Sequence, residues 1–530
     1  MSSLTRNVEI DKMDSMSLLL LSLAIAVFIS LLLSFLLKGG RHRLPLPPGP
    51  KPWPVLGNLP HLGTKPHQAM AAMTRKHGPM LHLRMGSVDV IVAASSSVAA
   101  LFLKIHDANF SSRPPNSGAK YIAYNYQDLV FAPYGPRWRA LRKICALHLF
   151  SAKAMDDFRY VREEEVRRLA TAMAKSSSTA EAVDLAQLLN VTTTNALGRV
   201  LLGNRVFGDI EGEDLRKADV FKEMVVEVMV LAGVFNVGDF IPWLHGLDLQ
   251  GVVRKMKALH RRFDQFLDGI IEEHRKEDPA VEHTNLLSVL MKLKDDGTAV
   301  EGVYITDTEI KALFLNLFTA GTDTSSSTTE WAIAELIRHP EVLAQAQREL
   351  DSVVGRDRLV SETDIPQLPY LQAVVKETFR LHPSTPLSLP RIASESCEIN
   401  GYFIPKNSTL LVNVWAIGRD PDVWKDPLQF RPDRFLPGGE AAHRDVRGND
   451  FEVIPFGAGR RICAGMSLGL RMVQFMTASL VHAFNWTLPE DQMPEQLDME
   501  EAYGLTLQRA VPLQVKPQRR LAPHVYDTTL

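Results

Sequence analysis

Cysteine is scarce in this sequence: Cys145, Cys397 and Cys463 are the only three among 530 residues. Their wide spacing excludes a disulfide framework and a CxxC pair for zinc, and it favours a reducing compartment in which at least one thiol stays free. An excess of one charge is lacking too, because 59 Lys and Arg residues face 61 Asp and Glu residues. No basic excess is left to neutralise phosphates, so nucleic acid is excluded as the main partner.

Charged residues are absent from the stretch 15–37. As a helix this stretch reaches roughly 34 Å, enough to cross a hydrocarbon core of about 30 Å. A cleaved signal peptide is the alternative, but its apolar part is usually only ~7–15 residues long. The stretch is followed by three basic residues, Lys38, Arg41 and Arg43. A positive flank resists translocation, so we expect residues 15–37 to be a retained single-pass anchor, with residues 1–14 in the lumen and everything after Lys38 in the cytoplasm.

Residues 38–54 combine that basic flank with a run of prolines, Pro45, Pro47, Pro48, Pro50, Pro52 and Pro54. Prolines fix φ and remove backbone donors, so this segment can be neither helix nor central strand. We expect a semi-rigid hinge. After it, no repeat, low-complexity segment or second linker interrupts the chain, and residues 55–530 are expected to form one domain.

Helical periodicity dominates that domain, for example over residues 151–175. Two stretches alternate instead and predict strands. One is 81–93, expected to be a hairpin around Gly86, and the other is 410–417. The fold class expected is therefore mainly α with minor β.

The stretch "PFGAGRRICAG", residues 455–465, surrounds Cys463 with arginines and glycines. Glycines let the backbone close around a sulfur, and a strong helix pattern begins just after it, so a thiolate would lie at a helix N-terminus. One thiolate cannot hold zinc alone, whereas iron already held by a macrocycle needs only one protein ligand. A buried free cysteine in a glycine-rich loop is the alternative that this stretch alone leaves open.

"FGAGRRICAG" resembles the F-x-x-G-x-R-x-C-x-G loop of the cytochrome P-450 monooxygenases. Four further motifs, all earlier in the chain, match that family in its order and spacing. The resemblance runs from the anchor to near the C-terminus. It implies the cytochrome P-450 fold, in which a long central helix crosses a haem-thiolate core, with haem b bound by Cys463 as the iron ligand and by Phe456 of the same loop. Residues 55–530 would then be the haem-binding catalytic domain, anchored in the endoplasmic reticulum.

The first of these motifs, "WRALR", places Trp138 and Arg142 on one helix face at i, i+4. An indole N–H and a guanidinium suit an anionic haem propionate. The resemblance assigns that role to this pair and to Arg391 and Arg461, whereas a solvated basic helix face is the alternative.

The second motif lies in a long helix expected from the capping box of Thr306 and Glu309 to Pro340. Its middle carries glycine, threonines and serines, and a mid-helix glycine costs roughly 1 kcal/mol. Local weakness of this kind inside a long apolar helix suggests a function. The match is to the family's oxygen-activation motif, A-G-x-D-T. It implies that Thr324 hydrogen-bonds dioxygen, that Asp323 feeds a proton network, and that small residues such as Ala320 leave room. A small-residue helix crossing is the alternative.

The third and fourth motifs are "KETFR" and "FRPDRF". Glu377 and Arg380 are i, i+3 on a helix, a very weak signal alone. The family pattern implies that Arg434 joins them in a buried structural triad. Asp433 stands where the family usually has glutamate.

The resemblance implies a monooxygenase that receives electrons from NADPH through a separate reductase, because no G-x-G-x-x-G nucleotide fingerprint is present. Arg139 and Lys143, on the helix of Trp138, are candidates for a basic face toward that reductase, with an ordinary solvated face as the alternative. An isomerase or dehydratase of the same haem-thiolate type would tend to lack the pair Asp323 and Thr324. A haem carrier would not need the break in the long helix.

Several stretches are similar to the plant flavonoid hydroxylases, above all those acting at the 3′ position of the B-ring: 90–95, 109–135, 446–465 and 503–510. This likeness places substrate-facing segments around 113–130, 222–236, 312–322, 384–389 and 503–508. Aromatic rings with polar tips suit a flat polyphenol. The candidates are Tyr121, Tyr124, Asn125, Phe131, Ala320, Tyr503 and Thr506, with aromatic core packing as the alternative. A sister 3′,5′-hydroxylase is the nearest rival, and Thr506 is a residue expected to decide between them.

Overall fold

The computed structural model describes residues 22, 25, 44–179, 181–208, 212–276 and 285–526. The predicted anchor at 15–37 lies outside these residues except for Ser22 and Ile25. Within the described ranges, no helix has the length and apolar character needed to cross a membrane. Two compact units are distinguished, residues 1–46 with 398–403 and residues 47–397 with 404–530. In the smaller unit the backbone N–H of Phe403 donates to the carbonyl of Pro45 (2.8 Å).

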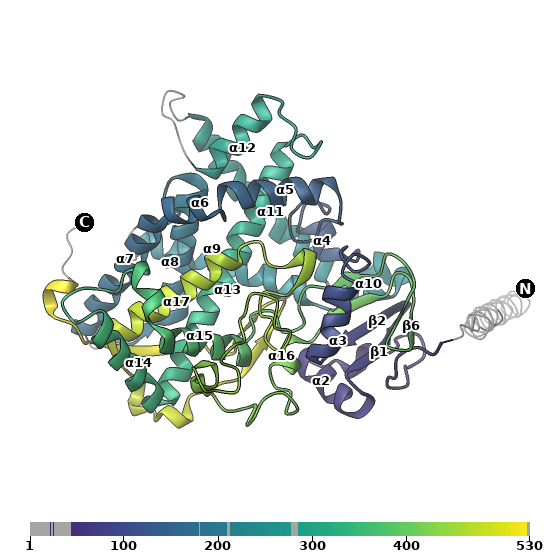
Figure 1. The fold of residues 1–530 in the computed structure, drawn as a ribbon. Coiled ribbons are helices and arrows are strands. Elements are labelled where there is room, and N and C mark those ends of the chain that lie inside the picture. The colour runs from purple at the N-terminus through teal and green to yellow at the C-terminus, as the bar shows by residue number, and fades with distance from the viewer. Residues whose placement is uncertain are drawn as a thin grey trace, which may run out of the picture. The chain divides into compact units, whose positions relative to one another are not determined.

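The protein is mainly helical with small sheets (Figure 1). The α-helices are α2 (Pro66–His77), α3 (Ser96–Ala100), α4 (Ser117–Tyr121), α5 (Pro136–His148), α6 (Ala152–Asp157), α7 (Arg159–Thr179), α8 (Leu185–Leu202), α9 (Gly212–Gly233), α10 (Val237–Phe240), α11 (Val252–Lys276), α12 (Leu286–Asp295), α13 (Asp307–Arg338), α14 (Pro340–Val353), α15 (Pro369–Leu381), α16 (Val414–Ile417) and α17 (Met466–Ala483). The short 3-10 and π-helical turns are η1 (Leu59–His61), η2 (Leu101–Ile105), η3 (Pro242–Leu247), η4 (Glu362–Gln367), η5 (Pro432–Phe435), η6 (Gly459–Arg461), η7 (Pro489–Asp491), η8 (Pro494–Gln496) and η9 (Pro523–Val525).

The strands form four small sheets. The largest has the order β1-β2-β7-β4, with β2 and β7 parallel and the other pairs antiparallel. A second has the order β3-β11-β8, and β9 pairs with β10 and β5 with β6. The strands are β1 (Met80–Met85), β2 (Val88–Ala93), β3 (Val183–Asp184), β4 (Arg391–Ile392), β5 (Cys397–Ile399), β6 (Tyr402–Ile404), β7 (Thr409–Val412), β8 (Phe484–Thr487), β9 (Glu501–Tyr503), β10 (Leu507–Arg509) and β11 (Gln514–Arg519).

The central element is α13, on which α8 and α17 pack (Figure 1). It begins, as predicted, with the capping box of Thr306 and Glu309, and α14 starts at Pro340 directly after it. Its N-terminal half lies in one apolar cluster with α9 and α11, and its C-terminal half in another with α7 and α17. The polar side chains between the two halves form hydrogen bonds within the helix, because their hydroxyl groups donate to backbone carbonyls four residues back. Thr319, for example, donates to the carbonyl of Leu315 (2.7 Å). The helix is continuous through this polar stretch, which lies between the two halves of the core.

The predicted hairpin is confirmed, with Gly86 at φ 53° between β1 and β2. The strand prediction for 410–417 is wrong in its second half, because β7 ends at Val412 and α16 follows. The side chain of Asn413 accepts a hydrogen bond from the backbone N–H of Ala416 (3.0 Å), which starts this helical turn. The helix predicted over 151–175 is interrupted at Phe158, which separates α6 from α7.

Residues 44–52 form neither helix nor strand, as their prolines predict. From Pro47 onward the segment runs along β1. The backbone N–H of His82 donates to the carbonyl of Pro48 (2.9 Å). A Cβ on Gly49 would lie 1.9 Å from the carbonyl oxygen of His82, so only glycine permits this approach.

Candidate active site

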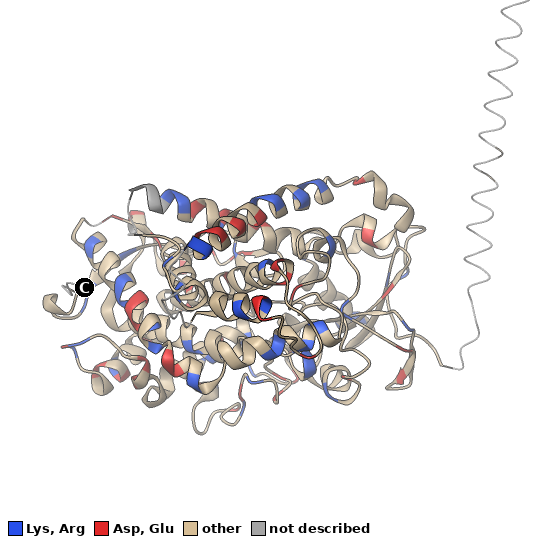
Figure 2. Cartoon of the chain, turned by 90° about the horizontal axis from the view of Figure 1, so that it is seen from above, with Lys and Arg blue, Asp and Glu red and all other residues tan. Residues whose placement is uncertain are grey.

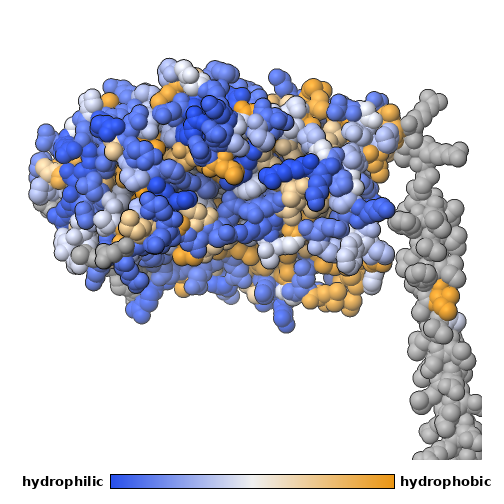
Figure 3. Space-filling view, turned by 90° about the horizontal axis from the view of Figure 1, so that it is seen from below, coloured by the Kyte–Doolittle hydropathy of each residue, from blue (hydrophilic) through white to orange (hydrophobic). Residues whose placement is uncertain are grey.

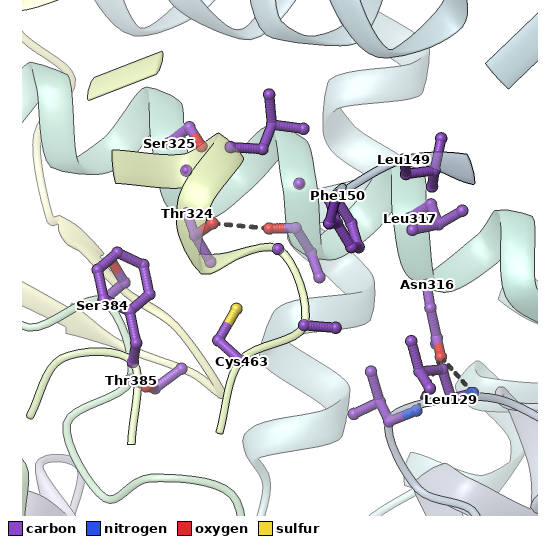
Figure 4. A pocket seen from close by; sticks show the side chains of 18 of the residues that line it. Leu129, Leu149, Phe150, Asn316, Leu317, Thr324, Ser325, Ser384, Thr385 and Cys463 are labelled. Atoms are coloured by element: carbon purple, nitrogen blue, oxygen red, sulfur yellow. Dashed lines mark hydrogen bonds between the residues drawn. The ribbon is translucent and has the colours of Figure 1, made fainter. Parts of the chain in front are cut away.

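The loop that carries Cys463 runs from η6 to the N-terminus of α17, whose N-cap is Gly465. The backbone N–H of Cys463 donates to the carbonyl of Phe456 (3.0 Å). Gly459 has φ 70°, and a Cβ there would lie 2.4 Å from the carbonyl oxygen of Leu103, so glycine is required. The resulting fold of the chain leaves the thiol of Cys463 exposed to an internal cavity (Figure 4).

The cavity wall encloses that thiol, and burial raises its pKa above the ordinary value. The backbone N–H of Gly465 and the positive charge of Arg142 oppose the rise. Both are features that favour a thiolate. Within the described part of the chain, no group of three or more His, Cys, Asp or Glu side chains could hold a metal ion.

The small-residue stretch of α13, which is helical throughout, forms another wall of the same cavity, with Ala320, Gly321, Thr324 and Ser325 (Figure 4). The hydroxyl of Thr324 donates to the carbonyl of Ala320 (2.7 Å). Gly321 also serves the helix crossing, since a Cβ there would lie 2.7 Å from Leu197 of α8. The small residues therefore do two things: they let α8 approach, and they leave space in front of Thr324.

Asp323 does not line the cavity, although it precedes Thr324. Its side chain is 3% exposed and faces the turn before β10 and that strand itself. The hydroxyl of Thr506 donates to its Oδ2 (2.6 Å), and the amide of Gln508 donates to its Oδ1 (2.5 Å). Burial raises the pKa of Asp323 to about 6, against the opposing effects of these hydrogen bonds and of the charge of Lys222.

Trp138 and Arg142 of α5 both line the cavity. Nη1 of Arg142 donates to the carbonyl of Ile462, next to the cysteine (2.7 Å). The guanidinium of Arg461 lies over the indole of Trp138, with its Cζ 4.6 Å from the ring centroid. The structure thus brings three of the four predicted propionate partners into one group.

Arg391 is the fourth, and it is held by Asp107 (3.1 Å) and by the carbonyl of Ala458 (2.7 Å). Arg113 joins them, although sequence reasoning did not single it out. Its guanidinium donates to three backbone carbonyls at 2.9–3.0 Å. Burial is the main cause that lowers the pKa of Arg113, and the charges of Arg461 and Arg391 add to it. Only its place in the segment 113–130 hinted at this position.

The residues present fit a haem. Of the described residues that line the cavity, none is Asp or Glu, while five are arginines. Arg461 donates Nε to Ser111 and Nη2 to Ala132, both at 2.6 Å, but its buried Nη1 has no hydrogen-bond partner among the described residues. A buried donor without a partner costs about 1–3 kcal/mol. An anionic group in the cavity would satisfy it, and the single thiol of Cys463 suits an iron already held by a macrocycle.

The triad residues meet in a buried cluster. Glu377 is fully buried, and it accepts two bonds from Arg380 (both 2.7 Å) and one from Arg434 (3.0 Å). The backbone N–H of Arg431 donates to it as well (2.8 Å). The cluster ties α15 to η5, and Phe379 of α15 packs edge-on against Phe456 of the cysteine loop.

The predicted substrate residues separate into two groups. Ala320 and Thr506 line the cavity, and each of the five predicted substrate segments contributes to its lining. The others are not among the lining residues: Tyr121, Tyr124, Asn125, Phe131 and Tyr503. Aromatic packing, the alternative stated for them, is present for Tyr124 and Tyr503.

Three of these residues have identifiable partners elsewhere. The hydroxyl of Tyr124 donates to Asp264 of α11 (2.8 Å), and its ring packs against His260. The ring of Tyr503 stacks on the ring of buried His67, with the two ring centroids 5.5 Å apart. The ring of Tyr121 lies under the ammonium of Lys257 (4.8 Å).

The polar groups that do line the cavity include several that sequence reasoning missed. Oδ1 of Asn316 accepts from the backbone N–H groups of Leu129 and Val130, both at 3.0 Å, which fixes the loop before α5 on α13 (Figure 4). Ser384 and Thr385 also face the cavity (Figure 4). They belong to the predicted segment 384–389.

The candidate reductase-facing residues are ion-paired. Lys143 contacts Glu301 at 2.9 Å and Arg139 contacts the same carboxylate at 3.8 Å. Positive and negative residues are mixed over the helices seen from above (Figure 2). The pair therefore does not form an unbroken basic face of its own.

Comparison with known proteins gives one family and several full-length relatives. The family described as Cytochrome P450 matches residues 47–517. A flavonoid 3′-monooxygenase from Petunia hybrida is 67% identical, and the match covers 97% of this chain and 100% of the relative. One of the same name from Arabidopsis thaliana is 62% identical over 96% of this chain and 99% of the relative. A flavonoid 3′,5′-hydroxylase from Crocosmia x crocosmiiflora is 58% identical over 97% and 99%.

Proposed function

This chain belongs to the cytochrome P450 family, and we propose that it is a monooxygenase that adds one hydroxyl group at the 3′ position of the flavonoid B-ring. Electrons would come from NADPH through a separate reductase. The observation that carries the proposal is the cavity that joins the thiol of Cys463 to the small-residue stretch of α13. A haem held by that thiolate supplies the chemistry that splits dioxygen when it is bound.

The arginines and Trp138 would orient the haem. The unpartnered Nη1 of Arg461 and the guanidinium of Arg142 would donate to the propionate groups, as charge-assisted hydrogen bonds do in general. The triad of Glu377, Arg380 and Arg434 takes no part in chemistry; it keeps the cysteine loop in place.

Proton supply would fall to Thr324 and Asp323. The hydroxyl of Thr324 faces the cavity, so it can orient or pass a proton there. With its pKa near 6, the Asp323 carboxyl is poised to hold and release a proton close to neutral pH. This pair also argues against the alternative of a haem-thiolate isomerase, which needs no proton supply for dioxygen.

The flavonoid substrate is proposed from the relatives and from the cavity lining. Two relatives named flavonoid 3′-monooxygenase are 62% and 67% identical to this chain, against 58% for one named 3′,5′-hydroxylase. Apolar side chains and a few hydroxyl groups line the cavity, among them Ser384, Thr385 and Thr506. Such a lining suits flat phenolic rings.

For its location, we propose a single-pass protein of the endoplasmic reticulum membrane with a cytoplasmic catalytic domain. Apolar side chains are exposed on both sides of the β1–β2 turn, which binds the backbone of Leu56 (3.1 Å) and of Phe240 (2.8 Å). The exposed residues are Trp53, Val55, Trp243, Leu247 and Leu249. Seen from below, orange patches interrupt a mostly hydrophilic surface (Figure 3). An apolar surface of this kind suits contact with a membrane.

The proposal is tested by product analysis in microsomes that contain the reductase. Naringenin should become eriodictyol, and dihydrokaempferol should become dihydroquercetin, each with NADPH and dioxygen required. A mainly 3′,5′ product would establish the sister activity instead. If no flavonoid is oxidised, only the monooxygenase class survives. Protease added to intact microsomes should digest the catalytic domain, and full protection would reverse the proposed orientation.

A further inference from the structure

The surroundings of Asp323 contain neutral hydrogen-bond donors and no ion pair. Within the described ranges, no Lys, Arg or His side chain forms a salt bridge with this carboxylate; its two side-chain donors are the hydroxyl of Thr506 and the amide of Gln508. Lys222 on α9 affects the pKa of Asp323 only through its charge. Its Nζ atom lies 3.9 Å from Oδ1 of Asp184, at the start of α8. Arg509, beside Gln508 on β10, pairs with Glu330 (3.6 Å).

The two donors differ in where they lie. Thr506 is 3% exposed and also lines the cavity, so it stands between Asp323 and the substrate space. Gln508 is only half-buried and does not line the cavity. One donor therefore faces the reaction space, while the other is partly exposed at the surface.

We propose that Gln508 is a positioning residue: together with Thr506 it holds the Asp323 carboxyl group beside the cavity through neutral hydrogen bonds in place of an ion pair. The inference rests on the proposed function, in which Asp323 supplies protons. A cation at position 508 would hold the carboxylate ionised, whereas an amide stabilises it less. A proton from Asp323 reaches the cavity through the Thr506 hydroxyl, which accepts it and releases its own proton on the cavity side, and the Asp323 carboxylate then takes a proton from solvent.

Loss of the Gln508 amide should raise the pKa of Asp323, because the amide stabilises the ionised form of that carboxyl group. Gln508 donates to the ionised carboxylate and so lowers its pKa against the effect of burial. Replacing Gln508 with leucine removes that donor, and the pKa of Asp323 should rise by about one to two units. The isosteric change Gln508→Glu keeps the shape but places a second carboxyl group beside the first, so the pair should titrate in two steps, one of them higher still.

The test measures the protonated carboxyl group directly. In the detergent-solubilised full-length holoenzyme, the infrared C=O band that Asp323→Asn removes is followed against pH. The midpoint should move upward by about one to two pH units in Gln508→Leu, and a second step should appear in Gln508→Glu. The matched control is Gln518→Leu, on the exposed side of β11, which should leave the midpoint unchanged.

A second measurement separates positioning from a general loss of structure. The pH at which the ratio of product to NADPH consumed falls by half should move with the infrared midpoint, because the acid form persists to higher pH. A purely structural role would lower the ratio by one factor at every pH and would overturn the proposal, as would an unmoved midpoint in both Gln508 variants. If flavonoids are not oxidised at all, the proposed function fails, while the infrared titration still decides the role of Gln508.

Discussion

Replacing Thr506 with serine and, separately, with alanine tests whether one side chain limits the substrate and also holds Asp323. Thr506 lines the cavity and donates its hydroxyl to Oδ2 of Asp323 at 2.6 Å. Serine removes only the methyl group, and alanine removes the hydroxyl as well. The two variants therefore separate the space at the ring from the hydrogen bond.

The two losses have different magnitudes and different readouts. One methyl group in an apolar pocket is worth about 1–3 kcal/mol, or 10–200-fold in discrimination. The ratio of dihydroxylated to monohydroxylated product made from naringenin should therefore rise by at most that factor in Thr506→Ser. A hydrogen bond to a charged group is worth about 1.5–3 kcal/mol, so Thr506→Ala should also raise the pKa of Asp323 by about one to two units from its value near 6.

The assay follows both products by chromatography while NADPH and peroxide are measured in the same reaction. Thr506→Ser should leak to the second hydroxylation with an unchanged yield of product per NADPH at every pH. Thr506→Ala should leak as well, and its yield should persist to a higher pH, because the acid form of Asp323 persists to a higher pH. Thr487→Ser, an exposed threonine on β8, is the matched control and should change neither quantity. An unchanged product ratio in the serine variant would refute the steric argument. A pH dependence of the yield that does not move in the alanine variant would refute the role of the hydrogen bond.

Three further changes test the rest of the site. Cys463→Ser should abolish the absorption near 450 nm of the reduced carbon monoxide complex, which Cys145→Ser should keep; a retained band would refute the ligand assignment. Glu377→Gln should destabilise the protein by about 3–5 kcal/mol, because two buried arginines lose their counter-charge; a denaturation midpoint equal to that of the unchanged protein would contradict this. Burial raises the pKa of Asp323 to about 6, so the folded protein holds a proton that the unfolded chain releases, and stability should fall as the pH rises from about 4 to 6. Asp323→Asn should remove about 3 kcal/mol of that fall, and an identical pH slope in the variant would count against it.

Features specified by neighbouring residues could be predicted from the sequence. The capping box at Thr306 sets the start of α13, and Gly86 sets the hairpin turn. The fold of the cysteine loop is set by glycines within a few residues of Cys463, and the helix after this loop has its own apolar pattern. In each case the information lies within one or two turns of the chain, where capping, glycine conformations and periodicity act.

Features that depend on distant partners could not be predicted in this way. An aromatic residue near the substrate segments has no local signal for the direction of its ring. Tyr124 turns toward Asp264, which is 140 positions away in the sequence. Gln508 meets Asp323 across 185 positions. The failed strand at 413–417 is the opposite case, since the cap at Asn413 is local but was outweighed by the alternating pattern around it.

The position of Asp323 links substrate selection to proton supply. Because its carboxylate turns away from the cavity and toward Thr506, the side chain proposed to limit how far the B-ring can rotate is also a hydrogen-bond donor to the proposed acid. A change that enlarges the cavity at this position but lacks a hydroxyl would therefore disturb proton supply as well as regioselectivity. Serine and threonine alone avoid that penalty, because both carry a hydroxyl on Cβ. A sister activity that accepts the dihydroxylated ring is thus reached with least disturbance through serine at position 506, with Gln508 kept to hold the other carboxylate oxygen.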